Sequence, residues 1–88
     1  METRGLQVFL SVADTLSFSR SAEHHHMSVS AVSRAVARLE DEVGQSLLQR
    51  DRRRVQLTSA GREFREYALR AVADWQQMQQ RLGRRGEL

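Results

Sequence analysis

The chain has 88 residues, which is enough for one small domain with a modest hydrophobic core. It contains no cysteine, which excludes a disulfide framework and a thiolate metal site, and it has no apolar run long enough to cross a bilayer. All 14 basic residues are arginine and the formal net charge is +3, so the total charge alone is a weak argument for a nucleic-acid partner. We expect a cytoplasmic location, because the N-terminus also lacks the basic-then-apolar layout of a signal peptide.

The first half of the chain predicts three helices, because apolar residues recur there at three- and four-residue spacing. The first helix runs roughly from Thr3 to Thr15, and the second opens at Ser17 and ends near His25 or His26. Ser28 is the predicted N-cap of the third helix, since a serine oxygen accepts from an amide two or three residues on. Gly44 stops that helix.

The second half predicts a hairpin and one long helix. Leu47 to Arg50 and Val55 to Thr58 are strand-like pieces around a polar turn. Thr58 caps a helix that runs to about Leu82, and Gly83 to Leu88 form a polar, frayed end. The expected fold is therefore mainly α with a small β-hairpin: a winged helix-turn-helix over residues 1–58, followed by a linker or dimerisation helix over residues 59–88.

The third predicted helix has the features of a helix that reads DNA. In a helix-turn-helix unit, the N-terminal residues of the outward helix reach base edges in the major groove. Its front is polar, and an arginine there can bind guanine with two hydrogen bonds while serines contact bases or phosphates. We therefore predict major-groove contacts from Ser30, Ser33 and Arg34.

Arginines crowd into the predicted hairpin turn. Taken alone, such a cluster is more simply read as a solvated turn, but beside a helix-turn-helix pattern it favours DNA binding. We predict contacts to the phosphate backbone from Ser28, Arg38, Arg50, Arg52 and Arg54.

The long helix carries a heptad-like apolar seam. Its first half covers the core of the small domain in part, but its outer half lies too far out for one domain to bury. We therefore predict a homodimer interface, favoured over an unpaired or membrane-lying helix, formed by Phe64, Ala68, Ala71, Trp75, Met78 and Leu82.

Several motifs together resemble the N-terminal domain of LysR-type transcriptional regulators. They are Phe18-Ser-Arg-Ser-Ala22, Ser28-Val-Ser-Ala-Val-Ser-Arg34, Leu39-Glu-Asp-Glu-Val-Gly44, Leu47-Leu-Gln-Arg50 and Val55-Gln-Leu-Thr-Ser-Ala-Gly61. The match is ungapped from Leu6 to the long helix.

This resemblance implies a winged helix-turn-helix with a linker helix that dimerises antiparallel on an imperfect inverted repeat in duplex DNA. It also implies a bacterial, nucleoid-associated protein, tetrameric at full length, whose C-terminal domain binds a small-molecule effector and is not in this chain. It places Val29, together with Ser30, Ser33 and Arg34, in the major groove, and Arg53 in the minor groove. Within the family, the chain looks most like the branch that regulates acetohydroxy acid isomeroreductase in branched-chain amino acid biosynthesis.

The chain departs from the family pattern at two places. His25 stands where an aliphatic residue usually ends the second helix, and it must find a hydrogen-bond partner or turn outward. Val29 stands where glutamine or proline is more usual. A valine side chain reduces hydrogen bonding to bases at this position, and it can instead make apolar contact with a thymine methyl.

Other function classes have less support. The three adjacent histidines point about 100° apart on a helix, so they do not converge on one metal ion. We expect no metal site, no cofactor in this part of the protein and no enzyme activity, since no catalytic arrangement of serine, base and carboxylate is present. A pure oligomerisation module is the main alternative, and it predicts dimers that do not retard DNA. Non-specific nucleoid or RNA binding has little support, because the basic charge is localised and no aromatic stacking platform is visible.

Overall fold

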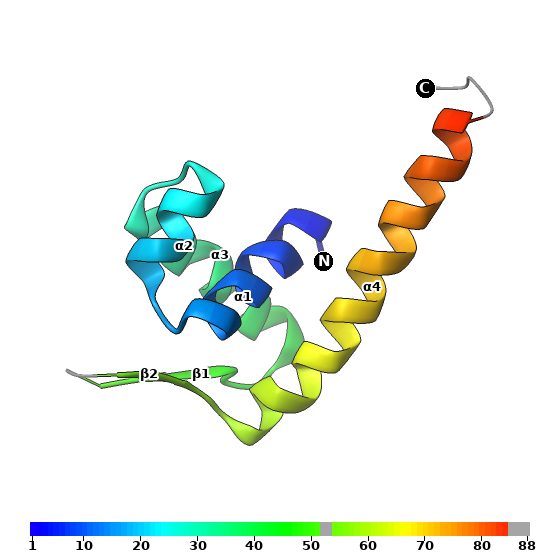
Figure 1. The fold of residues 1–88 in the computed structure, drawn as a ribbon. Helices are drawn as coiled ribbons and strands as arrows, with labels where there is room; N and C mark the ends of the chain where they lie inside the picture. Colours follow the sequence, from blue (N-terminus) through cyan, green and yellow to red (C-terminus); the bar gives the residue numbers. More distant parts are fainter. Residues whose placement is uncertain (52–53, 85–88) are drawn as a thin grey trace.

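The computed structural model describes residues 1–51 and 54–84. In chain order the elements are α1 (Thr3–Thr15), α2 (Phe18–His25), α3 (Val29–Val43), β1 (Leu48–Arg50), β2 (Val55–Leu57) and α4 (Ser59–Arg84). Figure 1 shows three short helices gathered into one body, a hairpin extending from its base, and α4 rising past it on the other side. This arrangement confirms the predicted fold class.

Local signals in the sequence set the helix ends. The side chain of Ser17 accepts from the amide of Arg20 at 3.1 Å, and that of Ser28 accepts from the amide of Ala31 at 3.0 Å. Gly44 ends α3 in the left-handed conformation, with φ of 81°. The predicted bounds of the first three helices are confirmed, and the starts of α2 and α3 and the end of α3 depend on a capping residue that lies next to them.

Two non-glycine residues share this left-handed conformation. Leu16 follows α1 with φ of 54°, and His26 follows α2 with φ of 53°. A side chain is sterically disfavoured there, at a cost of about 1–2 kcal/mol per residue. The amide of Leu16 donates to the carbonyl of Val12 at 2.8 Å, and that of His26 to Glu23 at 3.3 Å. Each turn therefore closes a helix despite lacking glycine.

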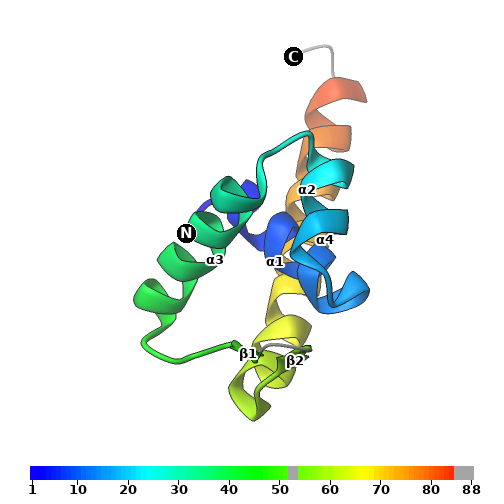
Figure 2. The same cartoon turned by 90° about the vertical axis from the view of Figure 1, so that its left-hand side faces the viewer.

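The core lies around α1, which packs against α2, α3 and α4 (Figures 1 and 2). Because α1 has neighbours on more than one side, its buried residues extend beyond a single narrow stripe. Val8, Phe9 and Val12 are all fully buried. From α3, Val32, Val36 and Leu39 complete the core, as the apolar periodicity predicts.

The hairpin is one residue shorter at each outer end than predicted. The strands pair antiparallel, with Leu48 opposite Leu57 and Arg50 opposite Val55. Leu47 precedes the strand because its amide donates to the Glu40 carboxylate at 2.7 Å. The amide of Leu48 donates to the same oxygen, Glu40 Oε2, at 3.2 Å. The carboxylate at the end of α3 thus fixes the entry into the hairpin.

The helix α4 begins in contact with the chain that leads into the hairpin. The hydroxyl of Thr58 accepts from the amide of Gly61 at 2.9 Å and donates to the carbonyl of Ser46 at 2.6 Å. Gly61 is buried there, and a Cβ built on it would lie 2.1 Å from the carbonyl oxygen of Leu47. The close approach requires glycine because a backbone atom occupies the space of a side chain.

The inner half of α4 belongs to the core. The ring of Phe64 meets the ring of Phe9 edge-on, with centroids 5.5 Å apart, and Ala68 is fully buried. This burial removes Ala68 from the predicted dimer interface, because it has no exposed surface to offer a partner; the rest of that interface stays a prediction. Ala71 is also packed against the core in part.

Candidate nucleic-acid interface

The exposed face of α3 begins at the N-terminus of the helix. Val29 is 48% exposed, and Ser30 and Arg34 are exposed as well. Ser33 is half-buried at the edge of this face, next to the hairpin. The four residues predicted to reach bases therefore lie together on the first turns of one helix, with Val29 and Ser33 beside the buried face that carries Val32 and Val36.

The hydroxyl of Ser28 is engaged within the protein. Its oxygen accepts from the Ala31 amide and lies 3.2 Å from the Ser30 hydroxyl. A serine hydroxyl has one proton and two lone pairs, so with one lone pair on the cap, the proton or the second lone pair of Ser28 serves the contact with Ser30.

Arg50 joins the hairpin to the helix-turn-helix. Its Nη1 donates to Ser33 Oγ at 3.1 Å. Its guanidinium carbon lies 4.4 Å from the centre of the Phe18 ring, the geometry of a cation–π contact. The sequence analysis placed Arg50 at a phosphate; in the structure it has two protein partners. No local pattern indicates them, because Ser33 lies 17 residues away in the chain.

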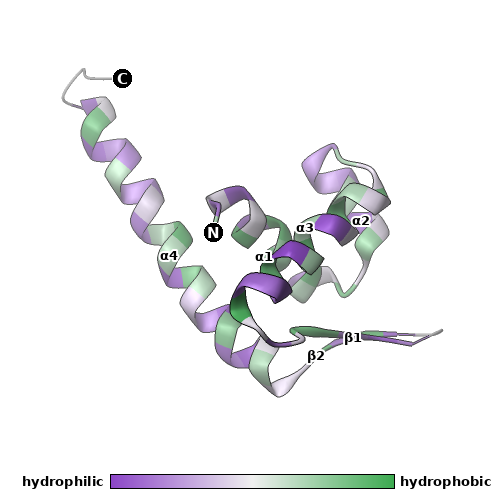
Figure 3. Ribbon diagram, turned by 180° about the vertical axis from the view of Figure 1, so that it is seen from behind, coloured by the Kyte–Doolittle hydropathy of each residue, from purple (hydrophilic) through white to green (hydrophobic). Residues whose placement is uncertain are grey.

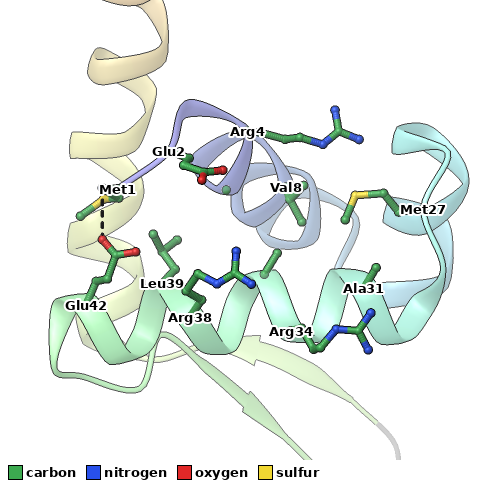
Figure 4. A pocket seen from close by; sticks show the side chains of 12 residues that line it. Met1, Glu2, Arg4, Val8, Met27, Ala31, Arg34, Arg38, Leu39 and Glu42 are labelled. Atoms are coloured by element: carbon green, nitrogen blue, oxygen red, sulfur yellow. Dashed lines mark ion pairs between the residues drawn. The ribbon is translucent and has the colours of Figure 1, made fainter.

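The other flank of α3 faces a cavity of about 400 Å³ against the start of α1. Arg4, Arg34 and Arg38 line it from the two helices (Figure 4). At one end of the cavity, the Met1 amino group lies 3.2 Å from a Glu42 carboxylate oxygen. Positive side chains therefore flank the front of α3, and Glu42 lies at its far end.

Two arginines are exposed on the hairpin: Arg50 at the end of β1 and Arg54 just before β2. The amide of Arg54 donates to the Asp51 carboxylate at 2.9 Å, which closes the turn and leaves the Arg54 side chain pointing to solvent. Arg52 and Arg53, predicted at the phosphate backbone and in the minor groove, lie outside the described residues.

The histidine triplet packs at the end of α2. Arg4 Nη2 donates to the carbonyl oxygen of His25 at 3.1 Å, and the His25 side chain is half-buried. Burial lowers the pKa of His25 below its ordinary value of 6.5, and the positive charges of Arg4, His24 and His26 lower it further. Within residues 1–51 and 54–84, no three His, Asp or Glu side chains group closely enough to hold a metal ion.

The outer half of α4 carries exposed apolar residues beyond the body of the domain. Trp75 is 47% exposed and Met78 is 41% exposed, while Leu82 is half-buried. Figure 3 shows hydrophobic bands recurring along α4 after it has left the other helices. No helix in the described part of the chain is long and apolar enough to span a membrane.

Residues 3–62 match the family described as bacterial regulatory helix-turn-helix protein, lysR family. The HTH-type transcriptional activator IlvY of Haemophilus influenzae is 44% identical over 82 residues, which cover 93% of this chain and 28% of that protein. The chain therefore spans less than a third of the length of this relative.

Solved structures agree with the sequence match. Vibrio fischeri DarR in complex with DNA superposes with a TM-score of 0.93 at 30% identity, over 99% of this chain and 30% of that one. The complex of BenM DBD with catB site 1 DNA gives a TM-score of 0.89 at 33% identity, over 96% of this chain and 93% of that one. The chain therefore belongs to the lysR family of bacterial regulatory helix-turn-helix proteins.

Proposed function

We propose that this chain is the DNA-reading part of a transcriptional regulator and binds duplex DNA sequence-specifically. The observation that carries the proposal is the exposed front of α3, joined at Ser33 to an arginine-bearing hairpin by a 3.1 Å hydrogen bond. A helix and a wing held together in this way can enter a major groove and follow the adjacent backbone. Structural relatives solved with DNA support the same reading.

The residues divide by the chemistry that they offer. Val29, Ser30, Ser33 and Arg34 face bases in the major groove, with the isopropyl group of Val29 against a thymine methyl. Arg38 and Arg54 bind phosphates, as do the hydroxyl of Ser28 and the side chain of Arg52, and Arg53 enters the minor groove. Residues 1–58 form the reading unit, and residues 59–88 the linker helix, whose first turns also close the core.

Two copies pair through the outer half of α4. A 26-residue helix is about 39 Å long, and its last turns have no neighbour within the described chain. Exposed Trp75 and Met78, with Leu82, give this segment an apolar face that water disfavours. A two-fold dimer then places two reading heads on the two halves of an imperfect inverted repeat.

The regulated process follows from the relatives. Transcriptional regulators named IlvY are 41–44% identical to this chain, and on that likeness the parent protein controls branched-chain amino acid biosynthesis. The parent protein senses a small-molecule effector through a C-terminal domain and assembles as a tetramer.

A binding selection from random duplex DNA tests the proposal. We expect a two-half-site sequence with centres about one helical turn or a multiple apart. Affinity for it should be about 10³-fold or more above that for scrambled duplex at physiological salt, falling steeply as salt rises. Arg34→Ala should cost about 1–3 kcal/mol and relax preference at one base pair.

Equal binding to selected and scrambled duplex would overturn the specific-reading proposal. Dimers in sedimentation with no DNA retardation at any salt would instead establish the chain as an oligomerisation module.

A further inference from the structure

Arg50 is positioned to control which DNA base the Ser33 hydroxyl can bind. The arginine ends β1, whereas Ser33 lies on the second turn of α3, at the edge of the exposed face. The 3.1 Å bond between Nη1 and Oγ is a charge-assisted hydrogen bond from a guanidinium to a hydroxyl. Arg50 therefore approaches the one α3 hydroxyl that lies between the helix and the hairpin.

Phe18 limits the positions that the guanidinium can adopt. It is the first residue of α2, half-buried against the core, and its ring face lies under Arg50 at 4.4 Å. A planar guanidinium stacked on an aromatic face keeps its N–H groups directed outward from the ring edge. The Phe18 ring, the hairpin and α3 thus meet at the Arg50 side chain.

The hydrogen bond from Arg50 biases the Ser33 hydroxyl toward donating its proton. A serine hydroxyl can donate once and accept twice, and its proton rotates to suit its partners. With a cationic donor directed at its oxygen, the hydroxyl is biased to donate its own proton elsewhere. In the major groove, guanine, adenine N7 and thymine O4 offer acceptors, whereas cytosine offers a donor at N4.

We propose that Arg50 is a specificity-positioning residue, which holds the Ser33 hydroxyl as a hydrogen-bond donor and so disfavours cytosine at the base that Ser33 contacts. The inference rests on the proposed function of sequence-specific DNA binding. It replaces the sequence-based expectation that Arg50 is a phosphate contact. It assigns Arg50 an action through Ser33, so its loss should alter selectivity at one position.

The experiment compares base preference among variants of the whole 88-residue chain. Wild type, Ser33→Ala, Arg50→Met and the double variant are each taken through the same binding selection. We expect Ser33→Ala and Arg50→Met to relax preference at the same position, each by about fivefold. The double variant should show about the same loss, not the roughly 25-fold product of two independent effects. Arg50→Lys, which keeps a charged donor, should regain preference relative to Arg50→Met.

Arg54→Met is the matched control, because it removes another exposed arginine of the hairpin. A phosphate contact does not discriminate between bases. This variant should therefore weaken binding to all sequences evenly and make the dependence of affinity on salt less steep. Its effect should multiply with that of Ser33→Ala. If Arg50→Met behaves like Arg54→Met, Arg50 is a phosphate contact and the inference is overturned. If wild type shows no base preference at any position, the proposed function itself fails.

A second measurement requires no substitution at Arg50 and no DNA. Ser33→Ala removes the acceptor, so the Arg50 guanidinium should become more mobile in ¹⁵N relaxation of its side chain. Phe18→Leu, which keeps an apolar group in the core but removes the ring face, should have the same effect. Unchanged Arg50 relaxation in both variants would overturn the inference even if Arg50→Met failed to fold.

Discussion

Replacing Gly61 with alanine should destabilise the chain severely, although alanine is the better helix former. The added Cβ would lie 2.1 Å from the carbonyl oxygen of Leu47 and 3.1 Å from Leu57 Cδ2. Ordinary carbon–oxygen contacts are about 3.3 Å or longer, so the first turn of α4 and the chain at Leu47 must separate by about 1 Å. Both partners of the worst contact are backbone atoms, which cannot rotate away as a side chain could.

The magnitude follows from what this separation disturbs. Leu47 is fully buried, its carbonyl accepts from the Thr58 amide at 3.0 Å, and its amide is held by Glu40. Overpacking costs up to about 3 kcal/mol, and the weakened hydrogen bond costs about 1 kcal/mol. Higher helix propensity returns about 1 kcal/mol. We expect a net loss of about 3 kcal/mol, which lowers Tm by roughly 12–24 °C for a domain of this size.

Urea and thermal unfolding followed by circular dichroism would measure the loss, at one protein concentration because the proposed dimerisation would shift the apparent stability. Gly5→Ala is the control: that glycine lies in α1 with nothing within 4 Å of an added Cβ. We expect it to be neutral or to stabilise by up to about 1 kcal/mol. The reasoning would be refuted if the free energy of unfolding of Gly61→Ala lay within about 1 kcal/mol of the wild-type value, because changes that small are typical of surface substitutions.

Three further predictions concern other parts of the chain. Ser21 is fully buried, with its hydroxyl 3.0 Å from that of Ser11 and 3.1 Å from that of Thr15. Ser21→Ala should lower the free energy of unfolding in urea by about 1–2 kcal/mol. Adding Ser11→Ala should recover part of that loss, because both hydroxyls of the Ser11–Ser21 hydrogen bond are then removed. The pKa of His25 is lowered in the folded chain, so the unfolded chain takes up a proton first as the pH falls. The free energy of unfolding should therefore fall as the pH drops through the ordinary histidine value of 6.5, and His25→Gln should flatten that fall; parallel curves for the two proteins would contradict this. Trp75→Glu should convert dimers to monomers in sedimentation without lowering the helix content of the core, and an unchanged dimer would remove Trp75 from the interface.

The sequence alone determined the helices and their ends. Ser17 and Ser28 cap helices that start next to them, and Gly44 ends a helix through its own backbone freedom. These signals act over three or four residues, so no knowledge of the fold was needed to interpret them. The apolar periodicity of α3 likewise separated Val32 and Val36 from the polar front, and the family motifs pointed to the winged helix-turn-helix.

Tertiary structure decided the contacts between segments that are distant in the chain. No local pattern indicates a partner for Glu40, yet its carboxylate accepts from two amides at the start of the hairpin. The heptad spacing predicted Ala68 in a dimer seam, but the packing of the core buries that residue completely. The arginine cluster predicted Arg50 at a phosphate, while the fold brings Ser33 and Phe18 to its guanidinium. The periodicity of one helix shows which residues share a face, but only the packing of the other elements determines what covers that face and where it ends.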